Sequence, residues 1–220
     1  MTFEFDWIEQ YADLILRGIV MTIELSVVGG LSDVVLGILA NRIVLTAGRA
    51  ARVPISIVVE FVRNTPFLIQ LFFIYFGLPG LGIRLSPLQA AMTAMIVNVG
   101  AYSTEIIRAG LEATPNGQVE AGLSLGMSRG EVFWHVQLVP ALRRIWPALS
   151  SQLVLVMLGS AVVSAISVED LSFAANFIQS RNFRAFETYF FLTFVYLALS
   201  FVYRLALNFV GRVVFPQGRL

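Results

Sequence analysis

The sequence predicts an all-α membrane protein with five transmembrane helices. Only 13% of its 220 residues are charged, about half the roughly 25% that soluble domains carry. The mean hydropathy is +0.80, and apolar residues gather in five long stretches separated by short polar or Pro- and Gly-bearing segments. A helix needs ~20 mostly apolar residues to cross the hydrocarbon layer, so the chain has room for five or six crossings. We therefore expect one transmembrane domain over residues 1–220 and no separate soluble catalytic domain.

The five apolar stretches are expected to be helices, because backbone groups in lipid must be hydrogen-bonded within their own segment. The second stretch ends at a Leu-Pro-Gly turn, residues 78–80. The fourth begins after the longest polar segment of the chain, residues 114–140. The predicted membrane helices cover residues 14–40, 54–78, 87–111, 141–168 and 186–210.

The distribution of arginine predicts which side of the membrane each loop faces. One side carries ten arginines: Arg42, Arg49, Arg52, Arg108, Arg129, Arg143, Arg144, Arg204, Arg212 and Arg219. The other side carries Arg17, Arg84, Arg181 and Arg184, against seven acids. Because cytoplasmic loops are enriched in basic residues, we expect the N-terminus outside and the C-terminus inside. The start of the chain is acidic, from Glu4 to Asp13, so no cleaved signal peptide is expected.

Polar residues within the predicted helices fall on one face of each helix. Such residues are costly in lipid and usually face the bundle interior or a water-filled path. The second helix carries Glu60, Arg63, Phe67 and Gln70 at helical spacing. The third carries Asn98, Tyr102, Glu105 and Arg108, and the fourth carries Ser160, Ser164 and Ser167.

Two interpretations of these polar faces are open. Glu60 with Arg63, and Glu105 with Arg108, are close enough in sequence to form structural ion pairs, which we favour over a role in transport. The remaining polar residues are expected to line a translocation path, although ordinary hydrogen bonding between helices is the alternative. The candidate path residues are Gln70, Asn98, Tyr102, Ser160 and Ser164.

The polar segment 114–140 is predicted to be a structured cytoplasmic loop, because it mixes charged residues with large apolar ones. Pro115 and the following Asn-Gly pair indicate a turn before a helix. A short helix over residues 118–125 should then stop near Gly126, since glycine commonly ends helices. Such a loop suits a docking element, and the alternative is an amphipathic segment lying on the membrane surface.

Three motifs in this order resemble one known family. Residues 120–126 (EAGLSLG), followed by 138–140 (LVP), are similar to the EAA loop of ABC importer permeases, with Gly122 where alanine is usual. Residues 63–71 (RNTPFLIQL) and 101–110 (AYSTEIIRAG) resemble the polar amino-acid uptake branch. The resemblance covers roughly residues 14–210. It implies the type I ABC importer permease fold, in a multi-pass protein of the bacterial cytoplasmic membrane.

The resemblance also implies a mechanism and partners. The chain would form the path for amino acids or similar small polar solutes and take its energy from a separate ATP-binding subunit. It has no G-x-x-x-x-G-K-[ST] loop and no lysine to complete one, so we expect no enzymatic activity and no cofactor here, with ATP and Mg²⁺ bound by that partner. The other expected partners are a second permease subunit, identical or not, an extracytoplasmic solute-binding protein and membrane lipid, but no nucleic acid. The expected coupling residues are Glu120, Ala121, Gly122, Leu123, Gly126 and Met127.

One departure from the family concerns the fourth helix. Many relatives carry a Lys-Asp or Lys-Asn pair there, whereas residues 157–162 read MLGSAV. Substrate contact at those positions is therefore open, and a partner permease that carries the contacts is one explanation.

Two other classes of function remain as alternatives. A secondary transporter or channel would work without ATP, but five crossings do not divide into two repeats. Asp33 in the first helix could be an ion ligand for such a transporter, but it has no obvious partner in the sequence. An intramembrane enzyme needs catalytic residues close together within the membrane. The single histidine, His135, lies in the predicted cytoplasmic loop, away from any acid or nucleophile in the membrane helices. No metal site is expected, because the chain has no cysteine and a single histidine.

Overall fold

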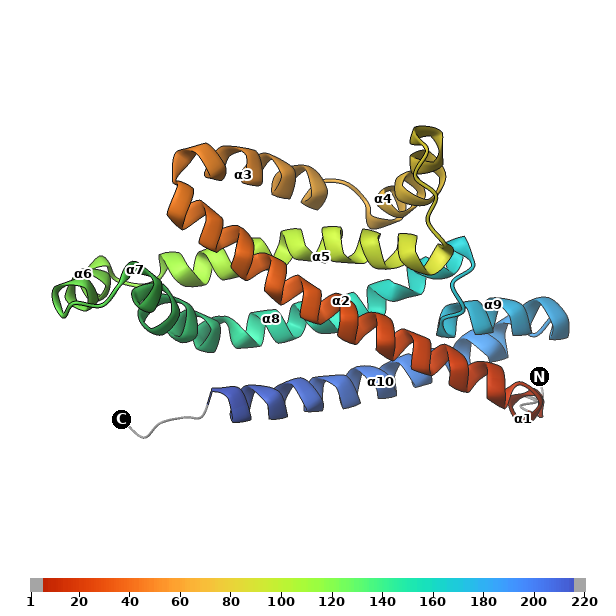
Figure 1. The fold of residues 1–220 in the computed structure, drawn as a ribbon. Helices are drawn as coiled ribbons and strands as arrows, with labels where there is room; N and C mark the ends of the chain where they lie inside the picture. Colours follow the sequence, from red (N-terminus) through yellow and green to blue (C-terminus); the bar gives the residue numbers. More distant parts are fainter. Residues whose placement is uncertain (1–5, 216–220) are drawn as a thin grey trace.

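A computed structural model describes residues 6–215, and within this range the chain forms helices and short connections (Figure 1). Glu4 and Arg219, which entered the charge pattern, lie outside the described residues. The α-helices are α1 (Trp7–Gln10), α2 (Ala12–Ala47), α3 (Arg49–Arg63), α4 (Phe67–Phe72), α5 (Pro87–Glu112), α6 (Asn116–Ser124), α7 (Arg129–Glu131), α8 (Val139–Gly159), α9 (Leu171–Asn182) and α10 (Ala185–Val214). Two π-helical segments are η1 (Phe73–Gly77) and η3 (Val132–Leu138), and two 3-10 segments are η2 (Leu78–Leu81) and η4 (Ser160–Ile166).

Four segments are long and apolar enough to cross a membrane, and a fifth crossing is bent. The straight ones are α2, α5, α10 and the run Arg129–Ile166 that contains α8. The fifth combines α3 with Phe67–Leu81, which meet at 105°. In Figure 1, α2, α5 and α8 run together along the long axis, while α3 and α4 lie on one side and α10 on the other. The predicted all-α class is confirmed, and five crossings are reached when the bent pair counts as one.

The second predicted helix, 54–78, is not continuous, and its break has a local cause. The residue before a proline is disfavoured in helical conformation, so Pro66 stops the helix at this point. The Asn64 side-chain amide then donates to the Glu60 carbonyl at 2.8 Å. The Gln70 amide donates to the Val62 carbonyl at 2.7 Å and to the Thr65 hydroxyl at 2.6 Å, across the break. Gln70 therefore satisfies backbone groups that the broken helix leaves free.

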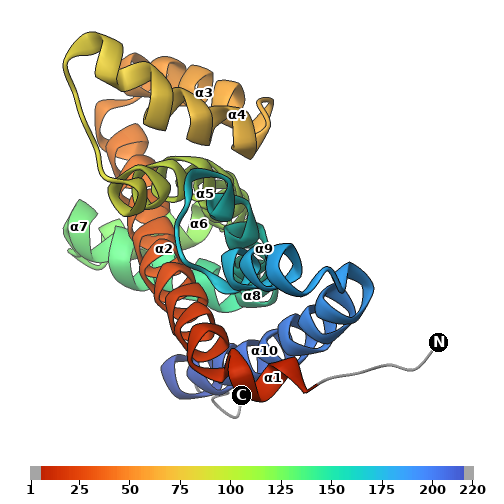
Figure 2. The ribbon, with the colours of Figure 1, turned by 90° about the vertical axis from the view of Figure 1, so that its right-hand side faces the viewer.

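The first long helix, α2, runs along one side of the bundle next to α5 and α9 (Figure 2) and buries a face rich in small residues. A Cβ on Gly37 would lie 3.0 Å from backbone carbon of Ser103 on α5, and one on Gly18 would lie 2.9 Å from the Cα of Leu171. The Asn41 amide donates to the Thr104 carbonyl of α5 at 2.9 Å. Small residues let membrane helices approach closely enough for such backbone contacts. The buried face of α2 comprises Ile15, Gly18, Thr22, Leu25, Ser26, Gly29, Gly30, Asp33, Gly37 and Asn41.

The fourth crossing changes helix type near its C-terminal end, which corrects the predicted serine face. After Gly159 the chain continues as the 3-10 segment η4 and stops at Ser167, whose φ is 64°. A 3-10 helix has three residues per turn, so residues four apart do not share a face. The Ser160 hydroxyl is buried and donates to the Met157 carbonyl at 2.7 Å, and Ser164 donates to the Ala161 carbonyl at 2.8 Å.

A helix not predicted from the sequence, α9, follows this segment. The Asp170 carboxylate accepts a hydrogen bond from the Phe173 backbone N–H at 2.8 Å and so caps the helix. The Leu171 N–H donates to the Thr22 hydroxyl of α2 at 3.2 Å. The interval between the fourth and fifth predicted helices therefore contains an ordered helix packed on α2 and α10.

Candidate functional site

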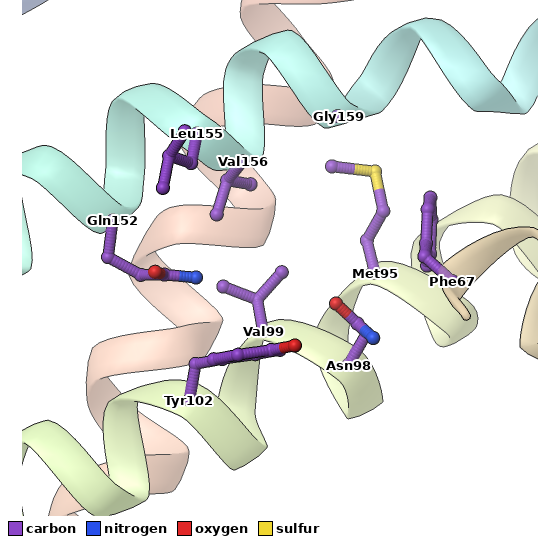
Figure 3. A pocket seen from close by; sticks show the side chains of 9 residues that line it. All are labelled: Phe67, Met95, Asn98, Val99, Tyr102, Gln152, Leu155, Val156 and Gly159. Atoms are coloured by element: carbon purple, nitrogen blue, oxygen red, sulfur yellow. The ribbon is translucent and has the colours of Figure 1, made fainter. Parts of the chain in front are cut away.

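A cavity of about 270 Å³ lies between α4, α5 and α8. Figure 3 shows residues of α8 facing residues of α5 across it, with Phe67 of α4 at one end. Its volume is just under the 300–1,000 Å³ or so of typical ligand sites. The lining residues are Phe67, Met95, Asn98, Val99, Tyr102, Gln152, Leu155, Val156 and Gly159.

Three polar side chains face this otherwise apolar space. Asn98 donates to the Gln70 side-chain oxygen at 3.1 Å, and Tyr102 donates to the Arg63 carbonyl at 3.4 Å. Gln152 makes no hydrogen bond with another described residue, so its amide is available to a solute. All three are half-buried. An apolar pocket with a few placed polar groups is the usual form of a small-molecule site.

The predicted path residues divide into two groups. Asn98 and Tyr102 line the cavity, and Gln70 lies behind Asn98 as its hydrogen-bond partner. Ser160 and Ser164 are not among the lining residues, since their hydroxyls bond the backbone of their own segment. Sequence reasoning missed Gln152, although a polar residue within an apolar helix is the signal that identified Asn98.

An ion-pair network connects the helix break to α5, and it corrects one predicted pair. Glu60 is exposed and forms no ion pair with Arg63, because the Arg63 guanidinium is directed to α5. Arg63 instead lies 3.6 Å from Glu105, with its guanidinium 5.5 Å from the Tyr102 ring centroid. The predicted pair of Glu105 and Arg108 is present at 2.8 Å, and Arg108 also binds Glu112 at 2.7 Å. The network thus runs along α5 from beside the cavity towards the loop that carries α6.

The loop after α5 contains the short helix α6, as predicted, and this helix ends before Gly126, which adopts a conformation that favours glycine. Gly126 has φ +83°, its N–H donates to the Leu123 carbonyl, and the Met127 N–H donates to the Gly122 carbonyl. These two bonds define a Schellman motif, in which a left-handed residue closes the helix. The left-handed conformation explains the glycine at position 126.

The coupling residues predicted on α6 do not all face the same way. Gly122 is buried, and a Cβ there would lie 3.1 Å from a Val132 methyl, so this position packs against the loop itself. Glu120, Ala121 and Leu123 are exposed. Glu120 lies beyond the first turn and caps no helix end, and it has no ion-pair partner among the described residues. Its side chain is free to meet another subunit.

The rest of the loop is fixed to the bundle. Ser128 and Glu131 form a capping box at the start of α7. Phe133 is almost fully buried, and the Arg42 guanidinium from the end of α2 stacks 4.6 Å from its ring centroid. The loop that carries α6 is therefore packed against the helices of the bundle.

Known proteins share this arrangement. Residues 3–215 match the family described as the inner membrane component of binding-protein-dependent transport systems. The chain belongs to this permease family. It is 35% identical over 209 residues to the glutamine transport system permease protein GlnP of Escherichia coli, covering 91% of this chain and 95% of the relative. It is 32% identical to the L-cystine transport system permease protein TcyB of Bacillus subtilis, covering 89% of this chain and 84% of the relative.

Solved structures agree with this assignment. The crystal structure of an amino acid ABC transporter with histidines superposes with a TM-score of 0.85 at 32% identity, covering 96% of this chain and 99% of that one. The MetNI methionine ABC transporter, at 21% identity, shares the fold with a TM-score of 0.77 over 94% and 98% of the two chains.

Three sequence predictions are thereby confirmed: the family, the type I permease fold and the location as a multi-pass protein of the inner membrane. The relatives are membrane permease subunits rather than catalytic ones, in agreement with the expectation that this permease is not an enzyme.

Proposed function

We propose that this permease forms the translocation path of an ATP-driven importer for amino acids and couples to a separate ATPase through α6. The observation that carries the coupling role is α6 itself, a helix at the end of the bundle (Figure 1) with exposed Glu120 and Leu123 and a fixed connection to α8. The permease lacks a phosphate-binding loop. ATP and Mg²⁺ therefore bind the partner, and its motion reaches the membrane helices through this contact.

The coupling role is tested by co-purifying the ATPase with the tagged permease. Glu120→Arg reverses the charge of the exposed acid on α6, so we expect at least a tenfold loss of retained ATPase, or about 1.4 kcal/mol of binding. Glu9→Arg makes the same charge reversal at an exposed glutamate of α1 and serves as the control. Equal retention by both variants would remove α6 from the interface.

The substrate proposal rests on the cavity between α5 and α8. The polar groups of the cavity are neutral amides and a phenol, which suit the polar groups of a small zwitterion. The relatives of this permease include glutamine and cystine permeases. We expect Gln152→Leu to reduce uptake of radiolabelled glutamine or cystine by tenfold or more while the ATPase remains bound. Gln179→Leu, the same change on α9 away from the cavity, should leave uptake near wild type. Normal uptake by Gln152→Leu would exclude this cavity as the substrate site.

Further partners follow from the open side of the cavity. Leu155 lines it and is 60% exposed, so this chain alone does not enclose a path. A second permease subunit would complete the wall, and an external solute-binding protein would load the outer end. The arginine distribution supports a cytoplasmic position for α6 and an external N-terminus.

A further inference from the structure

Asp33 on α2 carries a carboxyl group that lies outside both the cavity lining and the loop that contains α6. It is completely buried, and neither of its carboxyl oxygens has a hydrogen-bond partner among the described residues. It lies inside a membrane-spanning helix. An ionised carboxylate left alone in such an environment is very costly, so this group must be neutralised.

The packing of α2 identifies what surrounds Asp33. Three residues earlier, Gly30 packs against Leu153 of α8 and the Tyr203 hydroxyl of α10. Four residues later, Gly37 packs against the backbone of Ser103 on α5. Asp33 therefore faces the point where α2 meets three other helices.

Two hydroxyls at this level are also without partners. The Ser103 hydroxyl lies beside the Asp33 carboxyl, and it is fully buried and unpaired. Ser150, one turn before Leu153 on α8, is a second buried hydroxyl with no partner among the described residues. Buried polar groups are normally hydrogen-bonded, so an unpaired Asp33 carboxyl beside an unpaired Ser103 hydroxyl points to a proton that pairs these two groups.

No basic side chain of the described residues faces Asp33 from the helices packed around it. On α2, Arg42 stacks on Phe133, and on α5, Arg108 is paired with two glutamates. The arginines of α8 and α10 are exposed. Tyr203 is the titratable group that faces Asp33 from α10, and its hydroxyl donates to the Ser26 carbonyl at 3.3 Å.

We propose that Asp33 is a proton-binding site within the membrane, in which the neutral carboxylic acid donates its proton to the Ser103 hydroxyl and links α2 to α5. A protonated carboxyl carries one donor and retains acceptor capacity, which matches an unpaired hydroxyl. A metal cation would need about six oxygen ligands, whereas the free oxygens here belong to one carboxyl and two serines. The described neighbours offer no compensating positive charge, and this favours the neutral acid.

Infrared difference spectroscopy of the permease in its complex with the ATPase tests this proposal. A protonated carboxyl gives a carbonyl band separate from the carboxylate bands. At pH 6, where exposed carboxyl groups are ionised, we expect such a band in the wild type and its loss in Asp33→Asn, a change that keeps the size of the side chain. Ser103→Ala should shift the band without removing it. Asp13→Asn, which neutralises the exposed acid paired with Arg17, should leave the band unchanged.

Every other result counts against the proposal. Identical carbonyl regions in wild type and Asp33→Asn would mean that Asp33 is ionised. Stabilisation of the wild type by sodium chloride but not by choline chloride, lost in Asp33→Asn, would identify a sodium ion as the occupant. Should Asp33→Asn fail to assemble, the wild-type band is titrated instead: persistence at pH 6 supports the protonated acid, and loss below pH 6 overturns it.

Discussion

At the scale of single residues, Asp170 joins the start of α9 to α10. It caps α9, accepts a hydrogen bond from the Tyr196 hydroxyl at 3.4 Å and is fully buried. Burial raises the pKa of this carboxyl to about 6, from an ordinary value of 3.8. The folded protein therefore binds this proton more tightly than the unfolded chain does.

This difference in pKa predicts a pH dependence of stability. The contribution of the proton is complete below about pH 4 and is lost as the pH rises through 6, so the free energy of unfolding should fall by on the order of 1 kcal/mol between pH 5 and pH 7.5. Asp170→Asn keeps the cap but cannot ionise, so it should remove this component of the pH dependence. Thermal melts in detergent at the two pH values measure it, with the exposed Asp13→Asn as control. An unchanged pH dependence in Asp170→Asn would assign the effect to another group.

Gly211 is a second residue on which packing depends. A Cβ there would lie 2.1 Å from Trp146 Nε1, the atom that donates to the Leu207 carbonyl at 3.2 Å. We expect Gly211→Ala to destabilise the contact of α8 with α10 by about 1–3 kcal/mol, as overpacking does. Trp146→Phe removes the nearest of the clashing ring atoms, Nε1, and shortens the ring, so the double variant should lose less stability than the sum of the two single changes. Additive losses would show that the tryptophan is not the obstacle.

At the scale of elements, helix α6 is terminated by the left-handed backbone conformation of Gly126. An alanine at position 126 would have to adopt the left-handed conformation at a cost of about 1–2 kcal/mol. Nothing lies near a Cβ at this position, so the cost arises from the backbone alone. We expect Gly126→Ala to reduce ATPase retention roughly tenfold, while Gly117→Ala, in the first turn and equally open, should not. Equal retention by both would mean that the end of α6 is not needed for docking.

The helices that the sequence located well are those with local start and stop signals. The third was predicted over 87–111 and is found over Pro87–Glu112, behind a capping box of Ser86 and Gln89. The second was predicted as one helix because its apolar composition hides the stop at Pro66. The short helix α9 carries a signal that was available, since its buried residues follow an i, i+3, i+4, i+7 pattern: Leu171, Ala174, Ala175 and Ile178.

The candidate site was predictable only through its polar members. Asn98 and Tyr102 stand out in an apolar helix, and Gln152 does so by the same rule. The apolar lining residues, such as Met95 and Val156, look like any core residue in the sequence. Ser160 was wrongly predicted to line the path, because the change from α-helix to 3-10 helix alters which residues share a face. No local sequence signal predicts that change of helix type.

For the whole molecule, the orientation in the membrane is a direct test of the proposed import mechanism. The chain has no cysteine, so each introduced cysteine is the only thiol. Leu81 is 74% exposed at the end of the bent crossing, and Leu125 is 83% exposed at the end of α6. We expect an impermeant thiol reagent to label Leu81→Cys in spheroplasts and Leu125→Cys only in inverted vesicles. The reverse pattern would place α6 outside, where no ATPase can reach it, and the wild type controls for labelling without a thiol.

The small-residue face of α2 restricts how the transporter can change shape. At Gly37 the backbone of α2 lies against the backbone of Ser103 on α5, with the Ile107 side chain beside it. A shift of α2 along α5 at this level would therefore press main chain against main chain, and we expect the two helices to move together here. At the break around Pro66, by contrast, side-chain hydrogen bonds from Gln70 join the two parts of the bent crossing, and such bonds can exchange partners.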